Sequence, residues 1–463
     1  MAKKIKSIVL AITAALLYSS AAVAVENTGR FFPFSARPEK SLYKKGITAD
    51  VDFFYSSGRN IAQEDRTPLG VGEYAGKYNL RDIILAMKGN EISTQDVDQL
   101  IGKQNVNDPV LFNVHGKVRG GGGVLRYGLA VPGLSMMPVT FGVALPFMYV
   151  ESDVRYSLDT GPFMKGHFER NPSLLFGGID ADTVEIIQAG FQERLDHARR
   201  IAHEAIGLNN NYWAGPGIGD LDVFVRSNLL LDHKFMMRGI DIAIQYGIIL
   251  PTGVQRANKV VSSIPFMNDG HWSFYVQVAP TFELKQDLKC GFMVRGEHFI
   301  AKTKDRQLPI FKESFLYSPL IGSVRVQPGA TLIFNSFLAL ENVYDGLHLQ
   351  GRYTYKRHKA DTWEDMRIDK TIPSYLSRKV TDGAPGGQII TDKEIAGIIS
   401  AKEYLSKFRS HYITIQLTYD PLEAQQELLL KPKFFASIEA PVFDASRGIV
   451  QANQISIGAE LHF

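Results

Sequence analysis

Hydrophobic and polar residues alternate with a period of two along much of this chain. In the last segment, Ile455, Ile457 and Leu461 share one face of an extended strand. Gln454 and Glu460 lie on the other face. The same alternation recurs in twelve segments, near 47–57, 109–131, 138–151, 218–232, 237–251, 271–284, 288–302, 328–342, 346–358, 409–420, 431–442 and 452–463. Such segments predict β-strands with one apolar and one polar face.

The links between these strands alternate in length. The three longest links cover 58–108, 152–217 and 359–408, whereas the links 233–236 and 343–345 are short. Short turns on one side, long loops on the other and an even number of strands are typical of barrels in the outer membrane. We therefore predict an all-β, antiparallel up-and-down transmembrane barrel of about 12 strands, with 14 strands as the alternative.

The segment 109–131 departs from simple alternation. Its apolar residues occupy even positions as far as Val118 and odd positions from Leu125, with the run Gly120–Gly123 between them. We predict a β-bulge at these glycines, because one extra residue shifts the faces of a strand. If the glycines form a turn instead, the number of strands changes.

Three of the long links contain helical patterns. In the link 152–217, Asp182 and Glu185 resemble a capping box, apolar residues follow at helical spacing, and Gly207 ends the pattern. Further helices are predicted at 80–88, 93–101 and 391–407. An amphipathic helix must bury its apolar face. These helices therefore pack on each other as an external cap, or at least one enters the lumen as a plug.

The first 24 residues contain the three parts of a secretory signal. Residues 1–6 are basic, residues 8–17 are apolar, and Ala22-Val23-Ala24 is a small-x-small cleavage site. The apolar run is too short to span a bilayer. We expect residues 1–24 to be removed on export and residues 25–463 to form a barrel in the outer membrane of a diderm bacterium.

Charge and cysteine usage exclude two classes of function. The 463 residues include 51 basic and 48 acidic ones, and three of the basic residues belong to the expected signal. The remaining chain has no net charge, whereas a nucleic-acid-binding protein usually carries a basic excess. Cys290 is the only cysteine, which excludes zinc sites built from several thiolates.

Two motifs and the C-terminal residue resemble known membrane proteins. Gly217–Leu221 (GIGDL) and Gly247–Gly253 (GIILPTG) are similar to paired motifs in the outer-membrane transporters linked to aromatic (phenol meta-pathway) degradation, which are relatives of the long-chain fatty-acid channels. In that family the motifs begin one strand and end the next. Phe463 resembles the terminal signature of outer-membrane barrels. The resemblance implies a channel for small solutes, hydrophobic or aromatic ones included, that the barrel-assembly machinery inserts into the bilayer.

The polar faces of the predicted strands carry charges of both signs. The candidates for lining the lumen are Asp220, Asp222, Arg226, Asp241, Glu283, Arg295, Glu297, Glu341, Arg352 and Lys356. Lys117 and Arg119 are expected on the same inner face. Charged groups out of water need pairing or hydration. The lumen is therefore either a hydrated channel of weak ion selectivity or a closed network of ion pairs.

Two local features of this inner face bear on selectivity. Asp220, Asp222 and Asp241 are expected to form its most negative patch, with Arg226 as the nearest cation, and such a patch favours cations. Five apolar side chains share the face, and they suit a greasy or aromatic solute: Phe54, Phe224, Met293, Phe337 and Phe435.

No catalytic, metal or cofactor site is predicted. His271-Trp272-Ser273 resembles the His-x-Ser of outer-membrane phospholipases, but Phe274-Tyr275 stands where that family has Asn-Gly. His197 and His203 are six residues apart and do not share a helix face. We expect a channel or transporter with loops that gate or plug the lumen. A structural or surface-interaction barrel with a closed lumen is the alternative, and an outer-membrane lipase or protease is the less favoured one.

Overall fold

The computed structural model describes the barrel strands and part of the loops. The described residues are 46–62, 68–70, 78–87, 110–131, 138–158, 193, 195–208, 211–232, 237–309, 313–367, 406–421, 431–442 and 449–462. The expected signal, the predicted helix at 93–101, most of that at 391–407 and Phe463 lie outside these residues.

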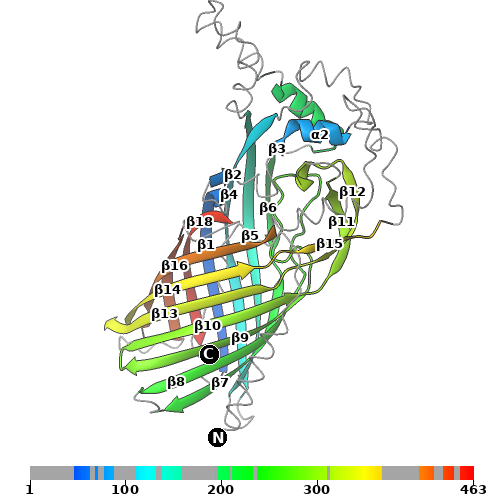
Figure 1. Ribbon diagram of the computed structural model, residues 1–463. Coiled ribbons are helices and arrows are strands. Elements are labelled where there is room, and N and C mark those ends of the chain that lie inside the picture. Colours follow the sequence, from blue (N-terminus) through cyan, green and yellow to red (C-terminus); the bar gives the residue numbers. More distant parts are fainter. Residues whose placement is uncertain are drawn as a thin grey trace, which may run out of the picture.

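Twelve antiparallel strands of the described chain close into a barrel (Figure 1). They are β1 (Gly46–Ala62), β4 (Leu111–Val131), β5 (Val139–Leu158), β7 (Leu221–Asp232), β8 (Gly239–Leu250), β9 (Ser273–Lys285), β10 (Leu288–Phe299), β13 (Thr331–Tyr344), β14 (Leu347–His358), β16 (Phe408–Tyr419), β17 (Lys431–Pro441) and β18 (Val450–His462). Each strand pairs with its neighbours in this order, and β1 closes the barrel by pairing with both β18 and β4. The prediction of a 12-strand up-and-down barrel is confirmed.

Several shorter elements lie at one end of the barrel (Figure 1). The predicted helix at 80–88 is confirmed as α2 (Leu80–Met87), and residues 195–205 form the described part of the helix predicted in the link 152–217. Two short strands, β2 (Pro68–Gly70) and β3 (Tyr78–Asn79), extend the edges of β1 and β4. No helix among the described residues has the length and apolar character needed to cross a membrane.

Two departures from the predicted elements concern the links. The link expected at 303–327 contains β11 (Lys302–Leu308), η3 (Phe315–Tyr317) and β12 (Leu320–Gln327). With β15 (Thr362–Asp365), the strands β11 and β12 form a separate three-stranded sheet. The fourth predicted strand begins earlier than position 218, because β6 (Tyr212–Ile218) also pairs with β5 and leads into β7 through Gly219 and Asp220.

The outward faces of the barrel strands are apolar. Many large hydrophobic side chains there are exposed, for example Tyr246 and Ile248 on β8, Ile415 on β16, and Ile455 and Ile457 on β18. The alternating residues on the opposite face are mostly buried. Apolar residues outside and polar residues inside are the pattern of a barrel that spans a membrane. The fold is therefore an outer-membrane-type β-barrel.

The predicted bulge at Gly120–Gly123 is wrong. β4 pairs residue for residue with β1 from Val118 to Ala130, and with β5 from Phe112 to Val131. Instead, the glycines allow the backbones of the neighbouring strands to approach closely. A Cβ atom added at Gly122 would lie 2.1 Å from the carbonyl oxygen of Phe147, which leaves no room for a side chain.

The apolar stripe of β4 changes sides because its surroundings change. On the short-turn side of the glycines, Leu125 is exposed on the outer face. On the long-loop side, Val114 and Val118 are buried on the inner face. Lys117 and Arg119 consequently lie on the outer face, so their expected inward orientation is wrong. The Arg119 guanidinium is 44% exposed and its Nε donates to Oε2 of Glu151, an outward residue of β5, over 2.5 Å.

Candidate functional site: the barrel interior and its mouth

An apolar cluster lies at the end of the barrel where the long loops lie. We call it the mouth cluster. Its wall residues are Phe54, Phe112, Val114, Val118, Met148, Val150, Val154, Val450 and Ala452. Its loop residues are Tyr78, Leu80, Ile83, Ile84, Leu195, Ala198, Ala202, Leu208, Val261, Ile264, Phe266, Leu316 and Tyr317. Four separate loop segments thus bury apolar side chains against the inner faces of β1, β4, β5 and β18.

Aromatic rings form the centre of the mouth cluster. The Tyr78 ring packs edge-to-face on Tyr317, with centroids 4.7 Å apart, and lies 5.2 Å from the Tyr156 ring. The Tyr78 hydroxyl lies 2.8 Å from Nε2 of His203, and the Arg199 guanidinium lies 4.4 Å from the Tyr156 ring centroid. Burial, and then the nearby charge of Arg199, lowers the pKa of His203 to about 3. The helix 195–205 is therefore held by a neutral histidine inside the cluster.

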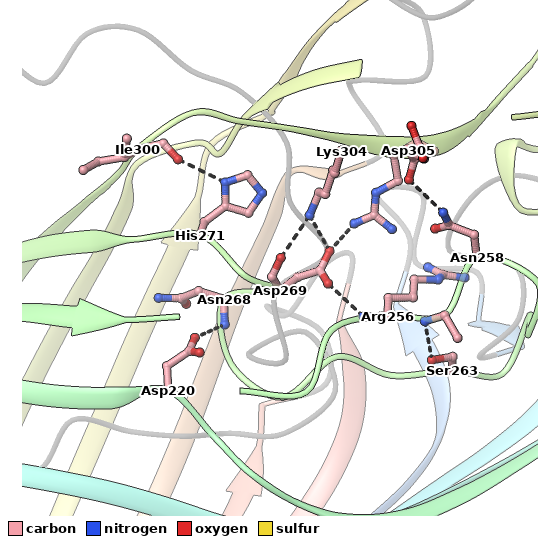
Figure 2. A network of polar contacts seen from close by, with 12 residues as sticks. Asp220, Arg256, Asn258, Ser263, Asn268, Asp269, His271, Ile300, Lys304 and Asp305 are labelled. Atoms are coloured by element: carbon pink, nitrogen blue, oxygen red, sulfur yellow. Dashed lines mark hydrogen bonds and ion pairs between the residues drawn. The ribbon is translucent and has the colours of Figure 1, made fainter. Parts of the chain in front are cut away.

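The loop between β8 and β9, residues 251–270, is fastened to the wall by Asp220 (Figure 2). The Asp220 carboxylate is fully buried and accepts the backbone N–H of Gly253 over 2.8 Å and that of Asn268 over 2.7 Å. Asp220 is therefore not a free lumen-lining carboxylate. The contact joins the two sequence motifs, since Asp220 is the fourth residue of the GIGDL motif and Gly253 ends the GIILPTG motif. A Cβ atom at Gly253 would lie 2.3 Å from the Phe266 carbonyl oxygen, so the joint requires glycine.

A second buried carboxylate, Asp269, ties the same loop to β11 (Figure 2). Its Oδ2 lies 2.6 Å from Nζ of Lys304 and also pairs with Arg306, and its Oδ1 accepts the N–H of Arg256 over 2.9 Å. Burial by itself raises the pKa of Asp269, but the charges of Arg306 and Lys304 outweigh it and hold this pKa well below its usual range. Asp269 and Met267 have positive φ angles of 50° and 69°. Such angles strain non-glycine residues and persist where surrounding contacts fix the chain.

Ion pairs on the inner wall are partly exposed at the end with short turns. The pairs are Arg126–Asp50 at 2.8 Å, Lys289–Glu341 at 2.6 Å, Lys433–Asp420 at 2.5 Å and Arg238–Glu283 at 3.6 Å. In three of these pairs both side chains are 20–50% exposed, which indicates access of water to this end of the interior.

The polar groups on the middle and loop-end parts of the wall strands are buried. Arg352 and Glu439 are each 4% exposed and lie 3.8 Å apart, and Glu439 also accepts the Thr414 hydroxyl over 2.8 Å. Glu297 accepts the Ser273 hydroxyl over 2.7 Å. The Lys356 ammonium lies 5.6 Å from the Phe408 ring centroid. The interior thus changes from hydrated pairs, through buried polar contacts, to the apolar mouth cluster.

Asp241 does not join Asp220 and Asp222 in the expected negative patch. Asp222 pairs with Ile249 on the adjacent strand, whereas Asp241 pairs with Leu230, eight residues farther along β7. At roughly 3.3 Å per residue, the two carboxylates belong to different ends of the strand. Asp241 accepts the side-chain amide of Asn228, which in turn accepts Nε of Arg226. Arg226 thus donates to Asn228, the residue that also donates to Asp241.

Tyr275 on β9 is a site residue that the pattern of charges did not indicate. Its hydroxyl contacts Asp222 and Gln245, and the guanidinium of Arg295 lies over its ring. The alternation of the sequence gave one signal, because it placed this aromatic residue on the polar face of its strand, two positions from Ser273.

The polar pair that resembles a phospholipase motif, His271 just before β9 and Ser273 at its start, has structural partners. His271 Nδ1 lies 3.0 Å from the carbonyl oxygen of Ile300, and the Ser273 hydroxyl donates to Glu297. His271 and Ser273 are both buried. In the part of the chain that the structure describes, His, Cys, Asp and Glu form no group of three or more that could hold a metal ion.

Solved structures of outer-membrane proteins align with most of this chain at low identity. No protein-family model matches the chain, and no curated protein matches it in sequence. An outer-membrane channel from Pseudomonas putida F1 aligns with 93% of this chain and 100% of its own, at 10% identity and a TM-score of 0.46. The transport unit of the autotransporter AIDA-I from Escherichia coli aligns with 94% of this chain and 95% of its own, at 7% identity and a TM-score of 0.38. The monoaromatic hydrocarbon channel TodX, in a mutant form, aligns with 91% of this chain and 92% of its own, at 6% identity and a TM-score of 0.31.

Proposed function

We propose that this protein is an outer-membrane channel for small solutes, hydrophobic or aromatic ones included, and that its loops gate the mouth. The observation that carries the proposal is the change of the interior from partly exposed ion pairs to the mouth cluster. A barrel wall with hydrated charges offers a path for solutes. An apolar constriction can close such a path by excluding water.

Some loop segments form a fixed part of this gate, and one segment forms a part that can move. Asp220 and Asp269 fasten the loop 251–270 to the wall and to β11 through buried contacts. The helix 195–205 inserts Leu195, Ala198 and Ala202 into the mouth cluster by apolar packing, beside the contact of His203 with Tyr78. Apolar packing is not directional, so we propose that this helix moves when the channel opens. The aromatic lining of the mouth and the resemblance of the two motifs to transporters support a hydrophobic or aromatic solute.

Conductance in planar bilayers tests the proposal. Leu195→Asp places a charge in the mouth cluster, and His197→Asp places the same charge on the exposed face of the same helix. We expect Leu195→Asp to raise the open probability strongly and His197→Asp to leave it near that of the unchanged protein. Addition of benzoate or octanoate should then reduce the current through the opened pore if such solutes enter it.

The absence of current from every variant, in protein that has folded and inserted, would contradict the channel proposal. That outcome favours the closed-lumen structural barrel, which the buried polar contacts of the wall also suit. Folding and insertion are checked by gel mobility, since a closed barrel with all backbone groups paired stays folded in unboiled samples and migrates faster.

The same mobility test applies to the expected route of assembly. We infer that residues 1–24 direct export and that residues 25–463 form the outer-membrane domain. We also infer that the barrel-assembly machinery engages the last strand, β18, which ends at His462. Deletion of Phe463 should lower the amount of heat-modifiable protein in outer-membrane fractions. Unchanged assembly of this variant would contradict the inferred role of the C-terminal residue.

A further inference from the structure

Tyr275 lies on the inner wall of the barrel, as the third residue of β9 from its loop end. It pairs across the sheet with Gly247 of β8 and Glu297 of β10, and its side chain is 2% exposed. A Cβ atom at Gly247 would lie 2.3 Å from Cζ of the Tyr275 ring. The ring therefore covers the bare backbone of β8 and extends from β9 toward β7.

The hydroxyl of Tyr275 has a defined hydrogen-bond direction. It accepts Nε2 of Gln245 over 2.7 Å and lies 3.0 and 3.1 Å from the two carboxylate oxygens of Asp222. A side-chain amide nitrogen only donates and an ionised carboxylate only accepts. The phenolic proton consequently points to Asp222, which fixes the position of this carboxylate on the wall.

The ring of Tyr275 also positions a cation. The guanidinium carbon of Arg295 lies 3.4 Å from the ring centroid, on the ring that already covers Gly247. The negative face of an aromatic ring attracts a guanidinium at this distance. One side chain thus holds an anion at its hydroxyl and a cation on its ring, on strands β7 and β10.

We propose that Tyr275 is a selectivity-determining residue of the channel, because it sets the positions of Asp222 and Arg295 on the inner wall. This inference rests on the proposed channel function. Removal of the hydroxyl alone should weaken the hold on Asp222 while the ring keeps Arg295 in place. The carboxylate then has greater freedom to attract permeating cations.

The test measures reversal potential in a gradient of potassium chloride, in the Leu195→Asp background that holds the pore open. We expect Tyr275→Phe to shift the reversal potential toward that of potassium, and Asp222→Asn to shift it toward that of chloride. In the presence of Asp222→Asn, Tyr275→Phe should have no further effect, because its effect passes through this carboxylate. Tyr246→Phe is the matched control, since Tyr246 is 58% exposed on the outer face of β8.

Two results would overturn the inference while leaving the channel function intact. One is a conducting Tyr275→Phe variant with the reversal potential of the Tyr246→Phe control. The other is an equal shift by Tyr275→Phe with and without Asp222→Asn, which would mean that the ring acts through another group. If the Leu195→Asp background conducts no ions at all, the channel proposal fails, and this inference fails with it.

Discussion

The two parts of β4 and β5 on either side of the run Gly120–Gly123 have the same strand pairing, but their apolar side chains lie on opposite faces. We call the part next to the short turns the lower part and the part next to the long loops the upper part. In the lower part, Leu125 and Phe141 are exposed on the outer face. In the upper part, the outer face carries the Arg119–Glu151 ion pair and the inner face carries Val118. The pairing runs through the boundary without a shift. The alternation of a strand therefore reports which of its two faces meets an apolar environment, and that face can change within one strand.

Strand length gives the physical reason for the change. A membrane-spanning strand needs about 9–11 residues, whereas β4 has 21. The lower part faces lipid on its outer side. The upper part extends beyond the bilayer, where its outer side meets water and its inner side meets the loops of the mouth cluster. Removal of buried charges from the loops and introduction of charges on the outer face test this division.

The largest effect is expected from Asp269→Asn, in the loop 251–270 that contributes to the mouth cluster. The change removes the buried charge between Lys304 and Arg306, and breaking a buried ion pair costs about 3 to 5 kcal/mol. The loss should affect the loop 251–270 and not the barrel wall. Hydrogen exchange at the Arg256 amide, which donates to Asp269, reports it directly. Asp305→Asn on the exposed side of β11 is the control, and equal exchange in both variants would contradict the assigned role.

The next effect compares two arginine substitutions on the outer face of β4. Leu125→Arg places a charge in lipid and should destabilise the barrel by about 2 to 4 kcal/mol if it lies near the bilayer midplane. Asn113→Arg lies on the same face of the upper part, where it is exposed to water, and should change stability by less than about 0.5 kcal/mol. Urea unfolding in lipid vesicles measures both values. Similar changes in unfolding free energy for the two variants would contradict the position assigned to the boundary between the lipid-facing and water-facing parts of β4.

The glycines at the boundary give a smaller effect. Gly122→Ala brings a methyl group against the Phe147 backbone and should cost about 1 to 3 kcal/mol. Gly215→Ala is the matched control, because no heavy atom lies within 4 Å of an added Cβ at that position. The same unfolding experiment compares them. If Gly122→Ala is as stable as the control, close backbone approach is not the reason for the glycine run.

The smallest effect is the response of the mouth cluster to a change of a single pH unit. His203 has a lowered pKa of about 3 in the closed cluster, so the closed form binds its proton less readily than an opened form with a pKa near 6.5. Closure is therefore most stable above about pH 6.5 and weakens by about 1.4 kcal/mol per pH unit below it, until the pH approaches 3. Open probability should rise about tenfold per unit of acidification. His203→Gln should remove this slope, and retention of the slope would assign it to other groups.

The sequence by itself determined the strands, their number and most of their orientations. The reason is local, because each strand records its two environments in the alternation of its own side chains. The same rule failed at Lys117 and Arg119, where the environments exchange sides above the bilayer. The helix at 80–88 was also predictable from periodicity, whereas β11 and β12 were not, since they belong to a sheet outside the membrane part.

Only the tertiary structure decided what the polar and aromatic residues do. Tyr78 contacts His203 across 125 positions of sequence, and Asp269 contacts Arg306 across 37. No local pattern encodes such pairs, because they depend on how loops from different strands meet at the mouth. The same holds for Asp220, which the sequence placed among the lumen charges and which the structure assigns to the backbone of a loop. Strand pairing, and not composition, likewise put Asp222 and Asp241 at opposite ends of one wall and placed Tyr275 between Asp222 and Arg295.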